Sequence, residues 1–125
     1  MRYLVSASLL VAGIVHLLPL SGAMGTERLA VLYGLDFSEP NLALLMRHRA
    51  VLFGLLGAFL VFAAFKPSLQ AVAFIAAFVS VLSFLLLAWS SGGYNALVGR
   101  VVIADVVALV ALVIGAATYL MNTNP

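Results

Sequence analysis

Cysteine is absent from this 125-residue chain, and charged residues make up only 8% of it. The absence of cysteine excludes disulfides, thiolate metal sites and cysteine nucleophiles. Only six basic side chains are present, without a basic patch of interleaved aromatics, which argues against a nucleic-acid partner. The hydrolase elbow, the phosphate-cradling loop, the zinc-binding HExxH motif and the dinucleotide fingerprint are also missing. The sequence thus indicates no catalytic residue, metal site or cofactor, and it leans against an enzyme.

Apolar residues dominate instead, at 66% of the chain with a mean hydropathy of +1.25. A soluble domain of this size leaves too much surface in water for such a composition, so the expected solvent is lipid. A membrane helix needs about 20 apolar residues, which leaves room for four spans in one transmembrane domain, residues 1–125. The predicted spans are residues 3–20, 41–65, 69–89 and 94–121. Ser38 and Ser68 are predicted to cap the second and third.

Short connections between these spans predict an all-α, up-down-up-down four-helix bundle. Residues 21–40 form the one sizeable loop, and Thr26 and Gly34 are predicted to begin and end a short helix within it. Leu29, Leu32 and Tyr33 would give that helix an apolar side, so we expect it to lie flat at the membrane interface. The first span resembles a signal peptide, but its apolar run is long, which favours a retained anchor.

An even number of spans places both termini on one side of the membrane. Arg2 and Lys66 lie on that side without acids, and the opposite side carries three acids in residues 21–40 against the single base Arg28. The positive-inside rule then predicts cytoplasmic termini. Counting Arg47, Arg49 and Arg100 as loop charges would reverse this orientation.

The most specific feature is Asp105, which lies within the otherwise apolar run 101–121. A carboxylate is expensive in hydrocarbon and normally faces protein or water with a partner. At about 1.5 Å per residue, Asp105 lies roughly 16 Å into its helix from the side of residues 21–40. His16, Arg47, Arg49 and Arg100 fall in the same leaflet. The sequence therefore predicts one polar cluster in that half of the bundle.

Helical phase suggests which arginine would meet Asp105. Arg47 shares a face with a stripe of small residues, Ala50, Gly54, Gly57 and Ala58, and such stripes mark helix contacts in membranes. Arg49 lies about 200° away around the helix and is expected to reach the headgroups. The predicted centre is therefore an Arg47–Asp105 pair lined by His16.

Three functions are compatible with this cluster. The leading interpretation is a structural or accessory membrane subunit whose Arg–Asp pair fixes helix register. The alternative is a pocket for an anionic lipid or small polar ligand, since arginine suits phosphate and carboxylate. A small transporter acting as an oligomer ranks lower. Lipid is the expected partner, and a larger membrane protein or a second copy is left open. Haem ligation by His16 and His48 is disfavoured, because His48 shares its side with leucines that face lipid.

Four segments carry a family resemblance: LMRHRAVLFG at 45–54, FKP at 65–67, GYN at 93–95 and RVVIAD at 100–105. They resemble a group of small four-helix bacterial inner-membrane proteins of unknown function, loosely similar to the DoxX-like proteins. The resemblance implies a bacterial inner membrane and supplies no activity. Members of the group are often labelled phosphopantetheine adenylyltransferase, but HLLP at 16–19 lacks the HxGH motif of those soluble enzymes.

Overall fold

The computed structural model describes residues 2–123, and every regular element within them is helical. In chain order the elements are α1 (Arg2–Leu17), the 3₁₀ helix η1 (Leu18–Met24), α2 (Thr26–Tyr33), α3 (Pro40–Ala64), the 3₁₀ helix η2 (Pro67–Leu69), α4 (Gln70–Ser90) and α5 (Ala96–Thr123). Four stretches are long and apolar enough to cross a membrane, namely Arg2–Met24, Pro40–Ala64, Pro67–Ser90 and Ala96–Asn122. The prediction of an all-α chain with four apolar helices is confirmed.

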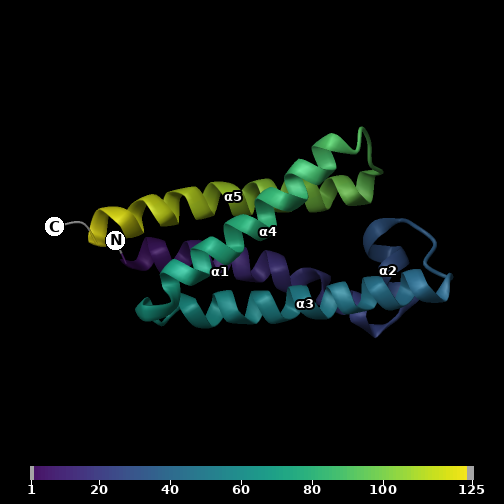
Figure 1. Ribbon diagram of the computed structural model, residues 1–125, viewed down its shortest axis with the longest axis horizontal. Coiled ribbons are helices and arrows are strands. Elements are labelled where there is room, and N and C mark those ends of the chain that lie inside the picture. The colour runs from purple at the N-terminus through teal and green to yellow at the C-terminus, as the bar shows by residue number, and fades with distance from the viewer. Residues whose placement is uncertain (1, 124–125) are drawn as a thin grey trace.

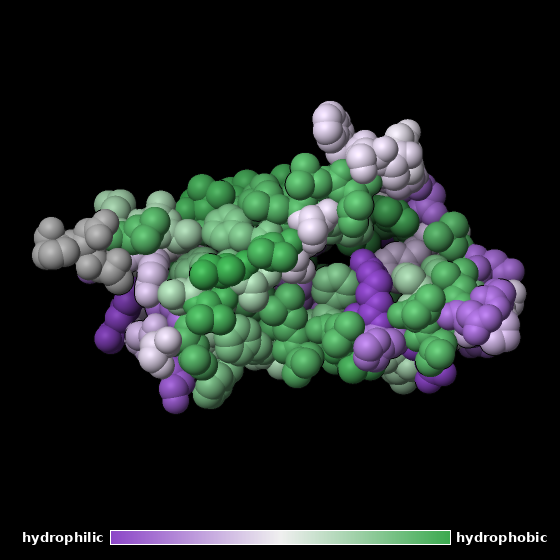
Figure 2. Space-filling model, viewed as in Figure 1, coloured by the Kyte–Doolittle hydropathy of each residue, from purple (hydrophilic) through white to green (hydrophobic). Residues whose placement is uncertain are grey.

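The helix α1 lies between α3 and α5 and makes its most extensive contacts with these two (Figure 1). α4 crosses the bundle and packs mainly on α5, with smaller contacts to α3 and α1. The start of α1 and the end of α5 lie at one end of the molecule, and α2 lies at the other (Figure 1). Figure 2 shows apolar side chains over most of one face, with hydrophilic side chains at the two ends and in a short column beside a hollow.

The core contains one large aliphatic side chain from each long helix. Leu9 of α1, Leu60 of α3, Val81 of α4 and Leu112 of α5 are fully buried and belong to a single cluster. In lipid the hydrophobic effect does not distinguish protein from acyl chains, so van der Waals packing must hold such helices together. Side chains that interlock at the centre of all four helices provide that packing.

Two glycines allow the backbones of α1 and α3 to approach closely. A Cβ on Gly57 would lie 2.8 Å from the Gly13 carbonyl oxygen and 3.0 Å from the backbone nitrogen of Leu17. Backbone atoms cannot move aside as a flexible side chain can. The predicted small-residue face of α3 is therefore buried at Ala50, Gly54 and Gly57, whereas Ala58, which was predicted to belong to it, is exposed.

The first helix changes form near Pro19. Its α-helical part ends at Leu17, and the chain continues to Met24 as the 3₁₀ helix η1. Proline has no N–H, so the amide of residue 19 cannot donate to the carbonyl four residues earlier. The 3₁₀ segment occupies residues that the sequence assigned to the end of the span and the beginning of the loop. It packs along α3 and brings the chain to α2.

Helix ends agree with the predictions only in part. Gly34 ends α2 in the left-handed conformation with φ of 67°, as expected, and its N–H donates to the carbonyl of Ala30. Thr26 does not cap α2, because it is already the first helical residue. Ser68 does not cap the third span either, since it lies inside η2.

The cap of α3 is Glu39 rather than Ser38. The Glu39 carboxylate accepts a 2.7 Å hydrogen bond from the backbone N–H of Leu42, and Pro40 follows as the first helical residue. This bond, together with one from the backbone of Asn41, lowers the pKa of Glu39. Ser38 instead bonds Asp36 through both its backbone N–H and its hydroxyl.

We predict that Gly57→Leu separates α1 from α3 and destabilises the protein by about 1–3 kcal/mol, the usual cost of overpacking a core. Ala58→Leu is the matched control, because its neighbouring position is exposed. Thermal unfolding in a mild detergent measures both variants. Equal unfolding temperatures for the two would contradict the close approach at Gly57.

Candidate functional site

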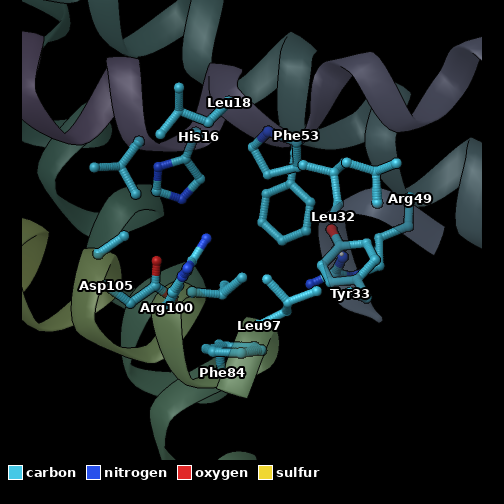
Figure 3. Close-up of a pocket in the computed structure, with 15 residues that line it drawn as sticks. His16, Leu18, Leu32, Tyr33, Arg49, Phe53, Phe84, Leu97, Arg100 and Asp105 are labelled. Atoms are coloured by element: carbon cyan, nitrogen blue, oxygen red, sulfur yellow. Dashed lines mark hydrogen bonds between the residues drawn. The ribbon is translucent and has the colours of Figure 1, made fainter. Parts of the chain in front are cut away.

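A cavity of about 350 Å³ lies at the end of the bundle that carries α2. All five α-helices and η1 contribute residues to its wall. Figure 2 shows a hollow at this part of the surface. The lining residues are Val15, His16, Leu18, Pro19, Val31, Leu32, Tyr33, Arg49, Phe53, Phe84, Leu97, Arg100, Val101, Ala104 and Asp105. Four of the five residues predicted to form a polar cluster, His16, Arg49, Arg100 and Asp105, therefore border one space (Figure 3).

His16 is buried and joins α1 to α4. Its Nδ1 lies 2.7 Å from the carbonyl oxygen of Ala12, and its Nε2 lies 2.8 Å from the hydroxyl of Ser80. A carbonyl can only accept, so Nδ1 carries the proton, and in the neutral ring Nε2 accepts from Ser80. Both ring nitrogens are thus engaged within the protein. His48 is exposed, so the structure does not bring together the two histidines considered as haem ligands.

Arg49 of α3 is half-buried and held by aromatic groups. Its Nη1 donates a 2.9 Å hydrogen bond to the hydroxyl of Tyr33, and its Cζ lies 4.4 Å from the centre of the Phe53 ring. Phe53 in turn contacts the ring of His16, at 5.7 Å between centroids. Stacking on an aromatic face suits the planar, weakly hydrated guanidinium. These contacts fix Arg49 at the cavity wall.

The position of Tyr33 depends on α2 and on the start of α5. Leu29, Tyr33 and Phe37 are buried in a small cluster packed against Met46 and Val98, among others. The apolar side of α2 therefore faces protein. Asn95 strengthens the junction: its side-chain amide donates to the Tyr33 carbonyl at 2.7 Å, and its Oδ1 accepts from the N–H of Val98 at 2.8 Å. One side chain thus caps α5 and ties α2 to it.

Arg100 and Asp105 both extend from α5 toward the cavity (Figure 3). Within residues 2–123, neither side chain forms a hydrogen bond or an ion pair. Every fully buried side-chain nitrogen or oxygen in that part of the chain has a partner, so the oxygens of half-buried Asp105 must be open to the cavity. The positive charge of Arg49 acts on Asp105 electrostatically.

The structure does not bring Arg47 to Asp105. Arg47 is exposed, does not line the cavity, and donates from Nε to the carbonyl of Ala23 at 3.0 Å. The predicted small-residue face is buried, but near Arg47 it meets η1, since a Cβ on Gly54 would collide with Leu20. Arg49, which was expected to reach the headgroups, takes the place at the site. The predicted Arg47–Asp105 centre is corrected accordingly.

A second cavity, of about 480 Å³, adjoins the first on the side of the α2–α3 connection. The two share Tyr33, Arg49, Phe84 and Val101 in their linings, so these residues form a common wall. Tyr33 was expected only on the apolar side of the short helix, and Phe53 and Phe84 were given no role. No signal in the sequence reveals these three, because their contacts join segments that are far apart in the chain.

Comparison of the chain with protein-family models, curated proteins and solved structures finds no match.

We predict that Ser80→Ala destabilises the protein, because Nε2 of buried His16 loses its partner, at a cost of about 1–3 kcal/mol. Ser83→Ala is the control: its exposed hydroxyl bonds only the Ser80 carbonyl, within α4. Thermal unfolding in detergent compares the two. If Ser83→Ala lowers the unfolding temperature as much as Ser80→Ala does, the hydrogen bond between His16 and Ser80 does not contribute specifically to stability.

Proposed function

We propose that this protein is a multi-pass membrane protein of the bacterial inner membrane whose cavity binds an anionic group. Its four helices would run up-down-up-down, with both termini in the cytoplasm and α2 at the opposite surface. The length and apolarity of the helices support the membrane assignment. The basic Arg2 and Lys66 on one side, against the acids of residues 21–40 on the other, support the orientation.

The arginines at the cavity carry the ligand proposal. Two guanidinium groups, Arg49 and Arg100, face one carboxylate, Asp105, so the lining has an excess positive charge. Arg49 uses one of its five N–H donors on Tyr33, and Arg100 uses none within the described residues. Free guanidinium donors in a concave, mostly apolar site match a phosphate or carboxylate, which they can bind in bidentate fashion. The anion would belong to a lipid headgroup or to a small polar molecule.

A purely structural ion pair is the weaker explanation. An ion pair that fixes helix register makes direct contact and leaves no room for a ligand. The attraction between two charges offsets the free-energy cost of removing them from water only at short range. Here Asp105 lacks an ion pair among residues 2–123 and borders a cavity. Those two features favour a binding site over a link between helices.

We predict that Arg49→Gln weakens anion binding roughly 10- to 100-fold, since a hydrogen bond to a charged group contributes about 1.5–3 kcal/mol. Native mass spectrometry of protein released from its own membrane would report a retained anionic phospholipid. Protection by glycerol phosphate against heat would report a soluble ligand.

Arg47→Gln is the matched control for this experiment, because Arg47 lies two residues away on α3 and outside the cavity. It should bind as the unaltered protein does. Equal losses of anion binding in both variants would mean that binding depends on the overall positive charge and not on the cavity. If neither lipid nor soluble anion is retained by the unaltered protein, the proposed function is wrong.

The natural absence of cysteine allows a clean test of orientation. We predict that an impermeant maleimide labels Ser38→Cys in cells stripped of their outer membrane, and labels Ser68→Cys only after the inner membrane is opened. Both positions are exposed in the structure. The reverse pattern would place the termini outside the cytoplasm.

A further inference from the structure

Asp105 is the charged group at the cavity that binding of an anion leaves unused. An ionised carboxylate only accepts hydrogen bonds, and none of the donors at the cavity wall, Arg49, Arg100 and the Tyr33 hydroxyl, bonds it. An anion held by the two arginines would add a second negative charge to the same partly open, mostly apolar cavity. Repulsion between like charges is strong where water is scarce. A ligand that carried only negative charge would therefore leave the Asp105 carboxylate without a hydrogen-bond donor, although the two arginines balance its charge.

We infer that the ligand is zwitterionic: a phosphate or carboxylate that binds Arg49 and Arg100, joined by a short linker to an ammonium group that binds Asp105. This inference rests on the proposed function and names the class of ligand for the same site. An ammonium group provides both the donor and the positive charge that the carboxylate lacks. Each of the three charged side chains then faces a ligand group of opposite charge.

The placement of these groups suits such a ligand. Arg100 and Asp105 are five residues apart on α5, about 7.5 Å along the helix axis, and both line the cavity. Arg49 faces them from α3 across the space and is bonded to the Tyr33 hydroxyl (Figure 3). Arg100 and Asp105 thus lie on the α5 side of the cavity and Arg49 on the α3 side (Figure 3). A ligand with its two charges at separate atoms can reach both sides at once.

The size of the first cavity matches the dimensions of a headgroup. Its volume of about 350 Å³ corresponds to roughly a dozen groups the size of a water molecule. The two acyl chains of a phospholipid do not fit in that space. The ligand is therefore either the headgroup of an aminophospholipid whose chains remain in the bilayer, or a soluble amino-phosphate or amino acid.

The ammonium group should be primary rather than quaternary. A trimethylammonium group has no N–H to donate to Asp105, and proteins bind it mainly with a cage of aromatic faces. Phe53 cannot contribute to such a cage, because the Arg49 guanidinium already lies over its ring at 4.4 Å. The site accordingly favours ethanolamine over choline.

The experiment measures lipid binding to the full chain in mild detergent by native mass spectrometry. The probes are phosphatidylethanolamine, phosphatidylglycerol and phosphatidylcholine with identical acyl chains. We expect the unaltered protein to prefer phosphatidylethanolamine at least tenfold over each of the others. Asp105→Asn should lose that preference, and Glu27→Gln should keep it, because Glu27 is an exposed acid on α2 outside the cavity.

A soluble probe distinguishes the two sources of the zwitterion. If O-phosphoethanolamine displaces phosphatidylethanolamine and stabilises the protein more than glycerol phosphate does, the ligand is a small solute. If only the lipid binds with this selectivity, the ligand is a headgroup. Either result supports a zwitterion.

Equal binding of phosphatidylethanolamine and phosphatidylglycerol by the unaltered protein, with no selectivity among the soluble probes, would overturn the inference. That measurement uses only the unaltered protein, so it tests the zwitterion inference even if Asp105→Asn fails to fold. Anion binding that still depends on Arg49 would then leave the proposed function in place. Loss of all anion binding would reject both.

Discussion

The site depends on the missing N–H of Pro19. Because α1 cannot continue as an α-helix through this residue, the chain tightens into η1 and runs along α3 to Met24. η1 covers the face of α3 on which Arg47 lies, and Arg47 bonds the carbonyl of Ala23 there. Arg49, on the other side of the helix, is then the arginine that faces α2, α5 and the cavity.

Properties that follow from composition and periodicity could be read from the sequence. The four apolar helices, the left-handed Gly34 at the end of α2 and the burial of His16 beside Ala12 and Gly13 all depend on residues close together in the chain. Depth along a helix is equally local, since it increases by a fixed rise per residue. Residues at one depth could therefore be grouped correctly, and four of the five predicted cluster residues line one cavity.

The rotation of each helix about its axis could not be read in the same way. Arg47 and Arg49 lie at nearly the same depth and differ by about 200° of rotation. The small-residue stripe identified a buried face of α3 correctly, but not the element that covers it. Near Arg47 that element is η1, whose 3₁₀ form places Leu20 and Ala23 there. Contacts such as Arg49–Tyr33 and His16–Ser80 likewise join distant segments, and no single-sequence pattern encodes them.

One wall of the cavity is formed by α2, which would not be stable as a separate helix. α2 spans only eight residues, too short to be stable as an isolated helix. It is held by the buried cluster of Leu29, Tyr33 and Phe37 and by the bond from Asn95 to the Tyr33 carbonyl. Tyr33 then orients Arg49 through its hydroxyl. The geometry of the arginine at the site is therefore set by the start of α5, more than 45 residues further along the chain, and the connection between α4 and α5 belongs functionally to the site.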